Sequence, residues 1–145
     1  MTEPFSETGS ETIVVVDDQA VVLEFCRTTL ERAGFTVFTA SNGEQALSLF
    51  EPNRSPINLA LIDVVMPGMS GVELAKRLEK LNTAVRIVLM SGYSPDEVKR
   101  VVGESASRYR SMWKPFEART LVRMIKNALD GEPRKSVAVS GRAGS

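Results

Sequence analysis

The sequence predicts a single α/β domain in which helices cover both faces of a parallel β-sheet. Short apolar runs alternate five times with amphipathic segments between Thr12 and Leu129, an order typical of parallel strands joined by crossover helices. The runs are almost continuously apolar, as expected for strands buried on both faces. At 145 residues and 43% hydrophobic content, the chain is long enough for one domain with a substantial core.

Five strands are predicted from short apolar or β-branched runs that end at polar or turn-forming residues. They span residues 12–16, 35–39, 57–62, 84–90 and 109–113. Five helices follow them, over residues 20–33, 71–81, 95–102 and 116–129, with one more opening at residues 41–44. Ser41, with Glu44 three residues later, is a candidate N-cap. Ser94, followed by Pro95 at the first helical position, is another.

Carboxylates follow two of the predicted strands. Asp17 and Asp18 end the first strand, and Asp63 ends the third. In a sheet of order 2-1-3-4-5, these two strands are neighbours and flank the topological switch point, so the three acids meet in one crevice. Carboxylates this close repel one another. The pattern therefore predicts a site for a hard divalent cation such as Mg²⁺.

Two donor side chains end the remaining strands on the same side of the sheet. Ser91 follows the fourth strand, and Lys114 follows the fifth. A hydroxyl and an amine beside a bound cation suit a phosphoryl group, whose transfer depends on positioning and charge neutralisation. Because the site offers neither His nor Cys nor a Walker loop, a carboxylate is the predicted nucleophile, and its product is an acyl phosphate.

Composition excludes several other classes of function. The chain has no histidine, which excludes Ser-His-Asp hydrolysis, histidine-ligated zinc and a phosphohistidine of its own. A net charge of zero gives no electrostatic argument for nucleic-acid binding. One cysteine, Cys26, permits no internal disulfide. With neither a signal peptide nor an apolar run near ~20 residues, we expect no membrane span and a cytoplasmic location.

Four motifs in order make the chain resemble the receiver domain of bacterial two-component response regulators. They are the Asp17-Asp18 pair, Asp63 within Asp-Val-Val-Met-Pro-Gly-Met-Ser-Gly, Ser91 within Leu-Met-Ser-Gly-Tyr, and Lys114-Pro-Phe. Each motif alone also fits a structural role, such as a turn, a helix cap or a solvated charge. Together, each after a predicted strand, they favour a receiver over residues 12–130, similar to stand-alone chemotaxis regulators. We expect disordered tails at 1–11 and 131–145.

The resemblance implies a flavodoxin-like fold and a role for each site residue. Asp63 would be the phosphoacceptor, while Ser91 and Lys114 would each contact a phosphoryl oxygen. The Mg²⁺ ligands would be Asp17, Asp18, Asp63 and the backbone carbonyl of Val65. The Lys114–Pro115 peptide bond would be cis, as is common in this family.

The chain departs from the family pattern at the residue that reports phosphorylation. Receivers usually carry Tyr or Phe three positions before the lysine, and here that position is Ser111. Strand alternation places Tyr109 and Trp113 on the same face as Ser111. Either aromatic takes over the conformational readout together with Ser91, or both simply pack under a neighbouring helix. Both interpretations stay open from the sequence.

Two further positions bear on the lifetime of the phosphorylated state. Val65, two residues beyond Asp63, and Tyr93, two residues beyond Ser91, flank the path of attacking water in this family. An apolar side chain and a bulky one should not orient water. We therefore expect slow self-dephosphorylation.

The resemblance implies a signalling module rather than an enzyme acting on a separate substrate. A partner histidine kinase or histidine phosphotransfer protein would phosphorylate Asp63, and the altered surface would bind a downstream target protein. Three alternatives stay open: a receiver segment of a hybrid histidine kinase, a degenerate receiver that binds partners without phosphorylation, and a Mg²⁺-dependent phosphatase of the haloacid dehalogenase type. The phosphatases carry Asp-x-Asp after strand one, whereas this chain has Asp17-Asp18-Gln19-Ala20.

Overall fold

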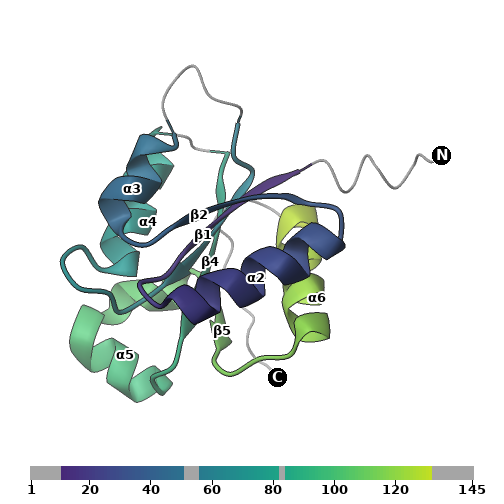
Figure 1. Ribbon diagram of the computed structural model, residues 1–145. Helices are drawn as coiled ribbons and strands as arrows, with labels where there is room; N and C mark the ends of the chain where they lie inside the picture. Colours follow the sequence, from purple (N-terminus) through teal and green to yellow (C-terminus); the bar gives the residue numbers. More distant parts are fainter. Residues whose placement is uncertain (1–10, 51–55, 82–83, 132–145) are drawn as a thin grey trace.

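The computed structural model describes residues 11–50, 56–81 and 84–131. Five parallel strands form one sheet in the order β2-β1-β3-β4-β5 (Figure 1). The strands are β1 (Thr12–Val16), β2 (Thr36–Ala40), β3 (Leu59–Asp63), β4 (Arg86–Ser91) and β5 (Arg110–Trp113). The sheet order agrees with the one expected from the sequence.

Helices lie on both faces of this sheet. They are α2 (Ala20–Arg32), α3 (Gly43–Ser48), α4 (Gly71–Leu81), α5 (Pro95–Val102) and α6 (Ala118–Asp130), with a short 3₁₀ helix η1 (Glu104–Arg108). In Figure 1, α2 and α6 cover one face, while α3, α4 and α5 cover the other. This alternation is what a doubly wound sheet requires, because right-handed crossovers change face where the strand order reverses.

The sheet divides the apolar interior into two cores. Ile13 and Val15 of β1 point toward α2 and α6, whereas Val14 and Val16 point toward α3, α4 and α5. Every residue of β1 and β3 is buried, which explains why both strands are nearly continuous apolar runs in the sequence. Side-chain alternation along each strand thus sends successive residues into different cores.

The helix caps confirm one expectation and correct another. Ser94 caps α5, and it forms a reciprocal capping box with Glu97. The cap of α3 is Asn42, not Ser41: the Asn42 side chain accepts the Gln45 N–H at 2.8 Å. Ser41 lies one residue before this cap, and its N–H and hydroxyl both donate to the Gln45 side-chain oxygen.

Several boundaries differ from the predictions, and η1 is an addition. Asp63 and Ser91 belong to their strands rather than following them, and α6 begins two residues later than expected, at Ala118. The polar sequence of η1 carries no apolar period that would predict a helix. The tails expected at 1–11 and 131–145 lie almost entirely outside the described residues. No helix in the described ranges is both long and apolar enough to cross a membrane.

Candidate functional site

The three acids meet where β1 and β3 end. Val16 pairs with Ile62, so Asp17 and Asp63 follow at adjacent positions on neighbouring strands. Carboxylate oxygens of Asp17, Asp18 and Asp63 lie within 4.8 Å of one another. Asp17 and Asp63 are buried, whereas Asp18 is exposed. The cluster therefore groups hard oxygen donors, two of them buried and one exposed to solvent, in an arrangement that fits a divalent cation.

Lys114 connects two of these acids. Its Nζ atom donates to Asp17 Oδ2 at 2.8 Å and lies 3.2 Å from Asp63 Oδ1. Its side chain is largely buried. Because the ammonium contacts both carboxylates, it offsets part of their repulsion. The Lys114–Pro115 peptide bond is cis, as the resemblance led us to expect.

Asp17 is held by contacts to both of its carboxylate oxygens. Oδ1 accepts the N–H of Gln19 at 2.8 Å, while Oδ2 accepts from Lys114. The backbone N–H of Asp17 donates to the Ala40 carbonyl, which fixes the end of β1 to β2. Asp17 is therefore preorganised, whereas the exposed Asp18 has more freedom to approach a cation.

The ionisation of Asp63 is unfavourable in this environment. Burial raises the pKa of Asp63 to about 6, and the nearby charge of Asp17 acts in the same direction, while Lys114 lowers it. Burial alone would lower the pKa of Lys114, but the hydrogen bond and charge of Asp17, together with Asp63, raise it above its ordinary value. The crevice thus holds more negative charge than one lysine offsets.

The Ser91 hydroxyl is engaged within its own loop. Ser91 is buried at the end of β4, and its Oγ accepts the N–H of Tyr93 at 2.9 Å. The same hydroxyl lies 3.4 Å from the Tyr93 carbonyl oxygen, to which it can donate. The sequence places Ser91 correctly at the strand end, but this local hydrogen bond is visible only in the structure.

Gly71 is a site-forming residue, although the sequence predicts it only as the first residue of a helix and the last residue of the Asp63 motif. A Cβ at this position would overlap the backbone carbonyl oxygen of Asp63. The Gly71 N–H also donates to the Val64 carbonyl at 2.8 Å. The start of α4 therefore packs directly against the backbone that carries Asp63. The only sequence signal for this close packing was the last glycine of the Met-Pro-Gly-Met-Ser-Gly segment.

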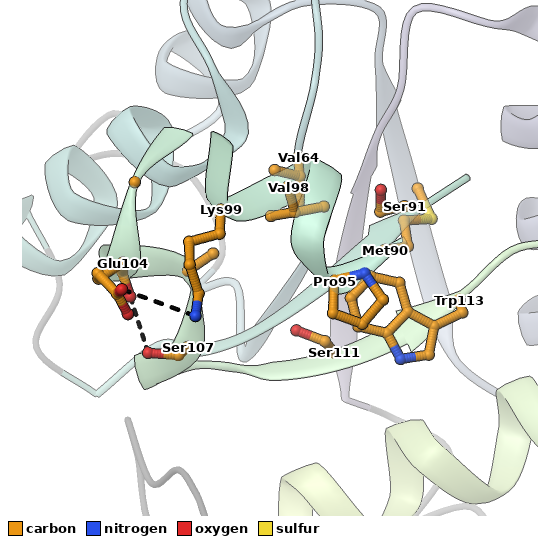
Figure 2. A pocket seen from close by; sticks show the side chains of 12 residues that line it. Val64, Met90, Ser91, Pro95, Val98, Lys99, Glu104, Ser107, Ser111 and Trp113 are labelled. Carbon is orange, nitrogen blue, oxygen red and sulfur yellow. Dashed lines mark hydrogen bonds and ion pairs between the residues drawn. The ribbon is translucent and has the colours of Figure 1, made fainter. Parts of the chain in front are cut away.

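The two aromatic residues around Ser111 have different environments. Tyr109 is buried, and its hydroxyl donates to Glu79 Oε1 of α4 at 2.9 Å. Trp113 is 43% exposed. Ser111 and Trp113 line a cavity of about 280 Å³ between β5 and α5, which also reaches Ser91 (Figure 2). Tyr109 is thus a packed residue, whereas Trp113 has room to move.

The comparisons with known proteins identify the class. The family model of the response regulator receiver domain matches residues 13–126. The chain belongs to this family, and the haloacid dehalogenase alternative is set aside.

Relatives with the same domain differ widely in length. The chain is 30% identical over 122 residues to the sensor kinase CckA of Brucella abortus, covering 84% of this chain and 13% of CckA. It is 33% identical over 136 residues to the phosphate regulon transcriptional regulatory protein PhoB of Pseudomonas aeruginosa, covering 90% of this chain and 58% of PhoB. The chain therefore spans only part of these relatives.

A solved structure supports the same fold. A CheY-like response regulator receiver domain protein from Methanospirillum hungatei superposes with a TM-score of 0.72 at 30% identity. The match covers 83% of this chain and 94% of that protein. The receiver family and the 2-1-3-4-5 sheet predicted from the sequence are thus confirmed.

Proposed function

We propose that this receiver is a phosphoacceptor in a two-component system or phosphorelay, and that Asp63 takes the phosphoryl group. One observation carries the assignment: Asp63 is a buried carboxylate with a raised pKa, in contact with Lys114 at the centre of an acidic cluster. Asp17 is tied by hydrogen bonds and Asp18 is exposed, which leaves Asp63 as the preferred nucleophile.

The donor set suits Mg²⁺. Its ligands would be Asp17, Asp18, Asp63 and the backbone carbonyl of Val65. These are hard oxygen donors, and the excess negative charge in the crevice favours a cation. When bound, Mg²⁺ supplies positive charge that offsets the repulsion among the acids and the charge of the phosphoryl oxygens.

The transfer itself needs little from the protein beyond positioning. A carboxylate oxygen of Asp63 forms a bond to phosphorus while the P–N bond of a partner's phosphohistidine breaks. The electron pair of that bond stays on the imidazole, which takes up a proton. The donor would be a histidine kinase or a histidine phosphotransfer protein. In this scheme the chain catalyses only its own phosphorylation and dephosphorylation.

Lys114 and Ser91 would hold the product. The Lys114 ammonium already lies between Asp17 and Asp63, so a phosphoryl oxygen on Asp63 falls within its reach. Ser91 would exchange its hydrogen bond with Tyr93 for one to a phosphoryl oxygen. The resulting shift at the end of β4 would change the surface near β5, where a downstream target protein would bind. We place this activity in the cytoplasm, without a nucleic-acid ligand.

Intact-mass spectrometry tests the assignment directly. The protein is incubated with acetyl phosphate and Mg²⁺, and we expect a mass increase of one phosphoryl group. The Asp63→Asn variant should not label. Asp96→Asn, which changes an exposed acid on α5, is the matched control and should label like the wild type.

An unlabelled wild type under conditions that label a known receiver would overturn the phosphoacceptor assignment. It would favour the degenerate receiver, in which partner binding proceeds without phosphorylation. Labelling that persists in Asp63→Asn would instead place the phosphoryl group on another residue.

A further inference from the structure

The strand β2 forms one edge of the sheet and is open to solvent. Within the described part of the chain, β1 is its only strand neighbour. The helices α2 and α3, which precede and follow β2 in the chain, cover opposite faces of the sheet (Figure 1). Thr36, Phe38 and Thr39 of β2 are exposed. The side of β2 that faces away from β1 is therefore accessible to another strand.

The backbone of β2 presents unpaired groups on this open side. The Thr36 N–H donates to the Glu11 carbonyl, so the backbone of Thr36 faces β1. Because the backbone groups of successive residues point to opposite sides of a strand, those of Val37 and Thr39 point away from β1. Within the described ranges, no hydrogen bond is recorded for these outward N–H and C=O groups. They are the groups that an added strand would pair with.

The open edge lacks the features that usually prevent pairing between chains. Natural edge strands are often blocked by a charged side chain or a proline. Neither occurs between Arg32 and Glu44, whereas β5 at the opposite edge carries Arg110. The residues of β2 include Val37, Phe38 and two threonines, all of which favour β-structure. The β2 edge is therefore suited to pairing with a strand from another molecule.

The alternation along β2 fits a second copy of β2 related by a twofold axis. In an antiparallel pair centred on Phe38, Val37 of one copy lies opposite Thr39 of the other. These are the residues with outward backbone groups, so each Val37–Thr39 pair can exchange both of its hydrogen bonds. The two Phe38 residues then form a pair without hydrogen bonds between them, in which the side chains approach most closely. The strand is thus complementary to itself, as a twofold interface requires.

The side chains and charges around β2 also match a second copy. Phe38 is 37% exposed, and pairing would cover this apolar surface. Arg32 and Glu44 are both exposed and lie equally far from Phe38 in the chain, one before it and one after it. An antiparallel arrangement therefore brings the basic flank of one copy toward the acidic flank of the other. The net charge of zero adds no overall repulsion between copies.

We propose that the β2 edge binds β2 of a second copy of this chain, forming an antiparallel, twofold-symmetric pair that joins the two sheets. The interface is one short strand from each copy, and it makes fewer contacts than a standard interface of ~1,200–2,000 Å². The dimer is therefore weak and reversible, with a dissociation constant of roughly 10 µM to 1 mM. The proposal goes beyond the proposed function and does not depend on it, because β2 carries none of the site residues.

Sedimentation equilibrium of the full chain tests the association. Between about 10 µM and about 1 mM protein, we expect a monomer–dimer equilibrium. Phe38→Lys places like charges opposite each other and should weaken the association by about tenfold or more. Phe25→Lys changes a phenylalanine on α2 that is 39% exposed, and this matched control should dimerise like the wild type. A wild type that stays monomeric over the whole range would overturn the proposal.

Mixing two variants tests the register at Phe38. Phe38→Glu alone should also be monomeric, but an equimolar mixture with Phe38→Lys should restore the dimer, because opposite charges then face each other. Circular dichroism establishes whether both variants fold. Should either fail to fold, Thr39→Pro removes an outward N–H without removing a bond to β1, and it should weaken the dimer in its place. A mixture that associates no better than either variant alone would contradict the register.

Hydrogen exchange measured by NMR tests the strand pairing without any variant. The amides of Val37 and Thr39 should lose their fast exchange as the protein concentration rises, because pairing would protect them. The amides of Thr36 and Phe38, which face β1, should stay protected at every concentration. Dimerisation without protection of Val37 and Thr39 would overturn pairing at this edge. A dimer that Trp113→Lys abolishes and Phe38→Lys leaves intact would place the interface near β5 instead.

Discussion

Gly71 packs so closely against the Asp63 backbone that the carbonyl oxygen of Asp63 occupies the space of a Cβ. The first residue of α4 and the last residue of β3 therefore constrain each other. The position of the proposed phosphoacceptor depends on the absence of a side chain eight residues later. Even a small substitution at Gly71 should therefore affect the phosphorylation of Asp63.

Gly71→Ala is expected to destabilise the fold by about 1–3 kcal/mol, because backbone must move to admit the methyl group. It should also slow labelling of Asp63 by acetyl phosphate. Urea unfolding and intact-mass kinetics measure the two effects. Gly92→Ala is the matched control, since a Cβ there meets nothing within 4 Å. Equal stability of both variants would contradict the close packing.

Asp63→Asn should stabilise the metal-free protein at neutral pH, by about 1–2 kcal/mol after discounting for solvent screening. The folded-state pKa of Asp63, about 6, exceeds the ordinary value of 3.8. Folding is therefore penalised once the carboxyl must ionise. This penalty is absent below pH 3.8, grows between pH 3.8 and 6, and is complete above pH 6.

Thermal unfolding in EDTA at pH 5 and pH 7.5 checks the sign. The advantage of Asp63→Asn over the wild type should be larger at pH 7.5. Mg²⁺ should reduce this advantage by stabilising the wild type. An advantage that shrinks as the pH rises would contradict the raised pKa.

Tyr109→Phe should cost about 1–2 kcal/mol of stability, because it leaves the partly buried carboxylate of Glu79 without the tyrosine hydroxyl. The other oxygen of this carboxylate, Oε2, is already buried without a hydrogen-bond partner in the described structure. Tyr93→Phe, at the half-exposed tyrosine, should be nearly neutral. Labelling of Asp63 should be unchanged in Tyr109→Phe. A large loss of labelling would instead indicate that Tyr109 takes part in the conformational readout of phosphorylation.

The phosphorylated state should decay slowly, because the apolar Val65 and the bulky Tyr93 should not help to orient an attacking water. Val65→Asn should speed the loss of the phosphoryl group by about tenfold, less than the ~10²–10⁴-fold that a well-positioned acid–base group contributes, because an amide only orients the water. Intact mass measured over time after donor removal gives the rate. Val101→Asn, at an exposed valine on α5, is the control. Fast decay in the wild type would contradict the expectation.

The main site residues could be predicted because the fold itself places them. Asp17, Asp63, Ser91 and Lys114 all occur where a parallel strand ends, and the strand order brings these ends together. Their hydrogen-bond partners were not predictable in the same way. Ser91 bonds to its own loop, and Lys114 contacts two acids at once, because of side-chain rotamers that strand position does not determine.

Other features depend on contacts between distant segments. Tyr109 and Glu79 are thirty residues apart, and neither belongs to a motif that would link them. The exposure of Trp113 depends on how α5 and η1 pack, and η1 itself has no apolar period. The cap of α3 is Asn42 rather than Ser41, because the Asn42 side chain accepts the Gln45 N–H while Ser41 bonds to the Gln45 side chain.

The separation of the interior into two cores allows the two sides of the molecule to diverge independently in evolution. A change of volume among α3, α4 and α5 can be compensated within that layer, because alternate strand residues keep it apart from the layer under α2 and α6. Lineages could therefore remodel the surface around Trp113 while the acids at the strand ends stay in place. The same fold can in this way acquire a new partner protein while the acidic site that carries Asp63 is kept.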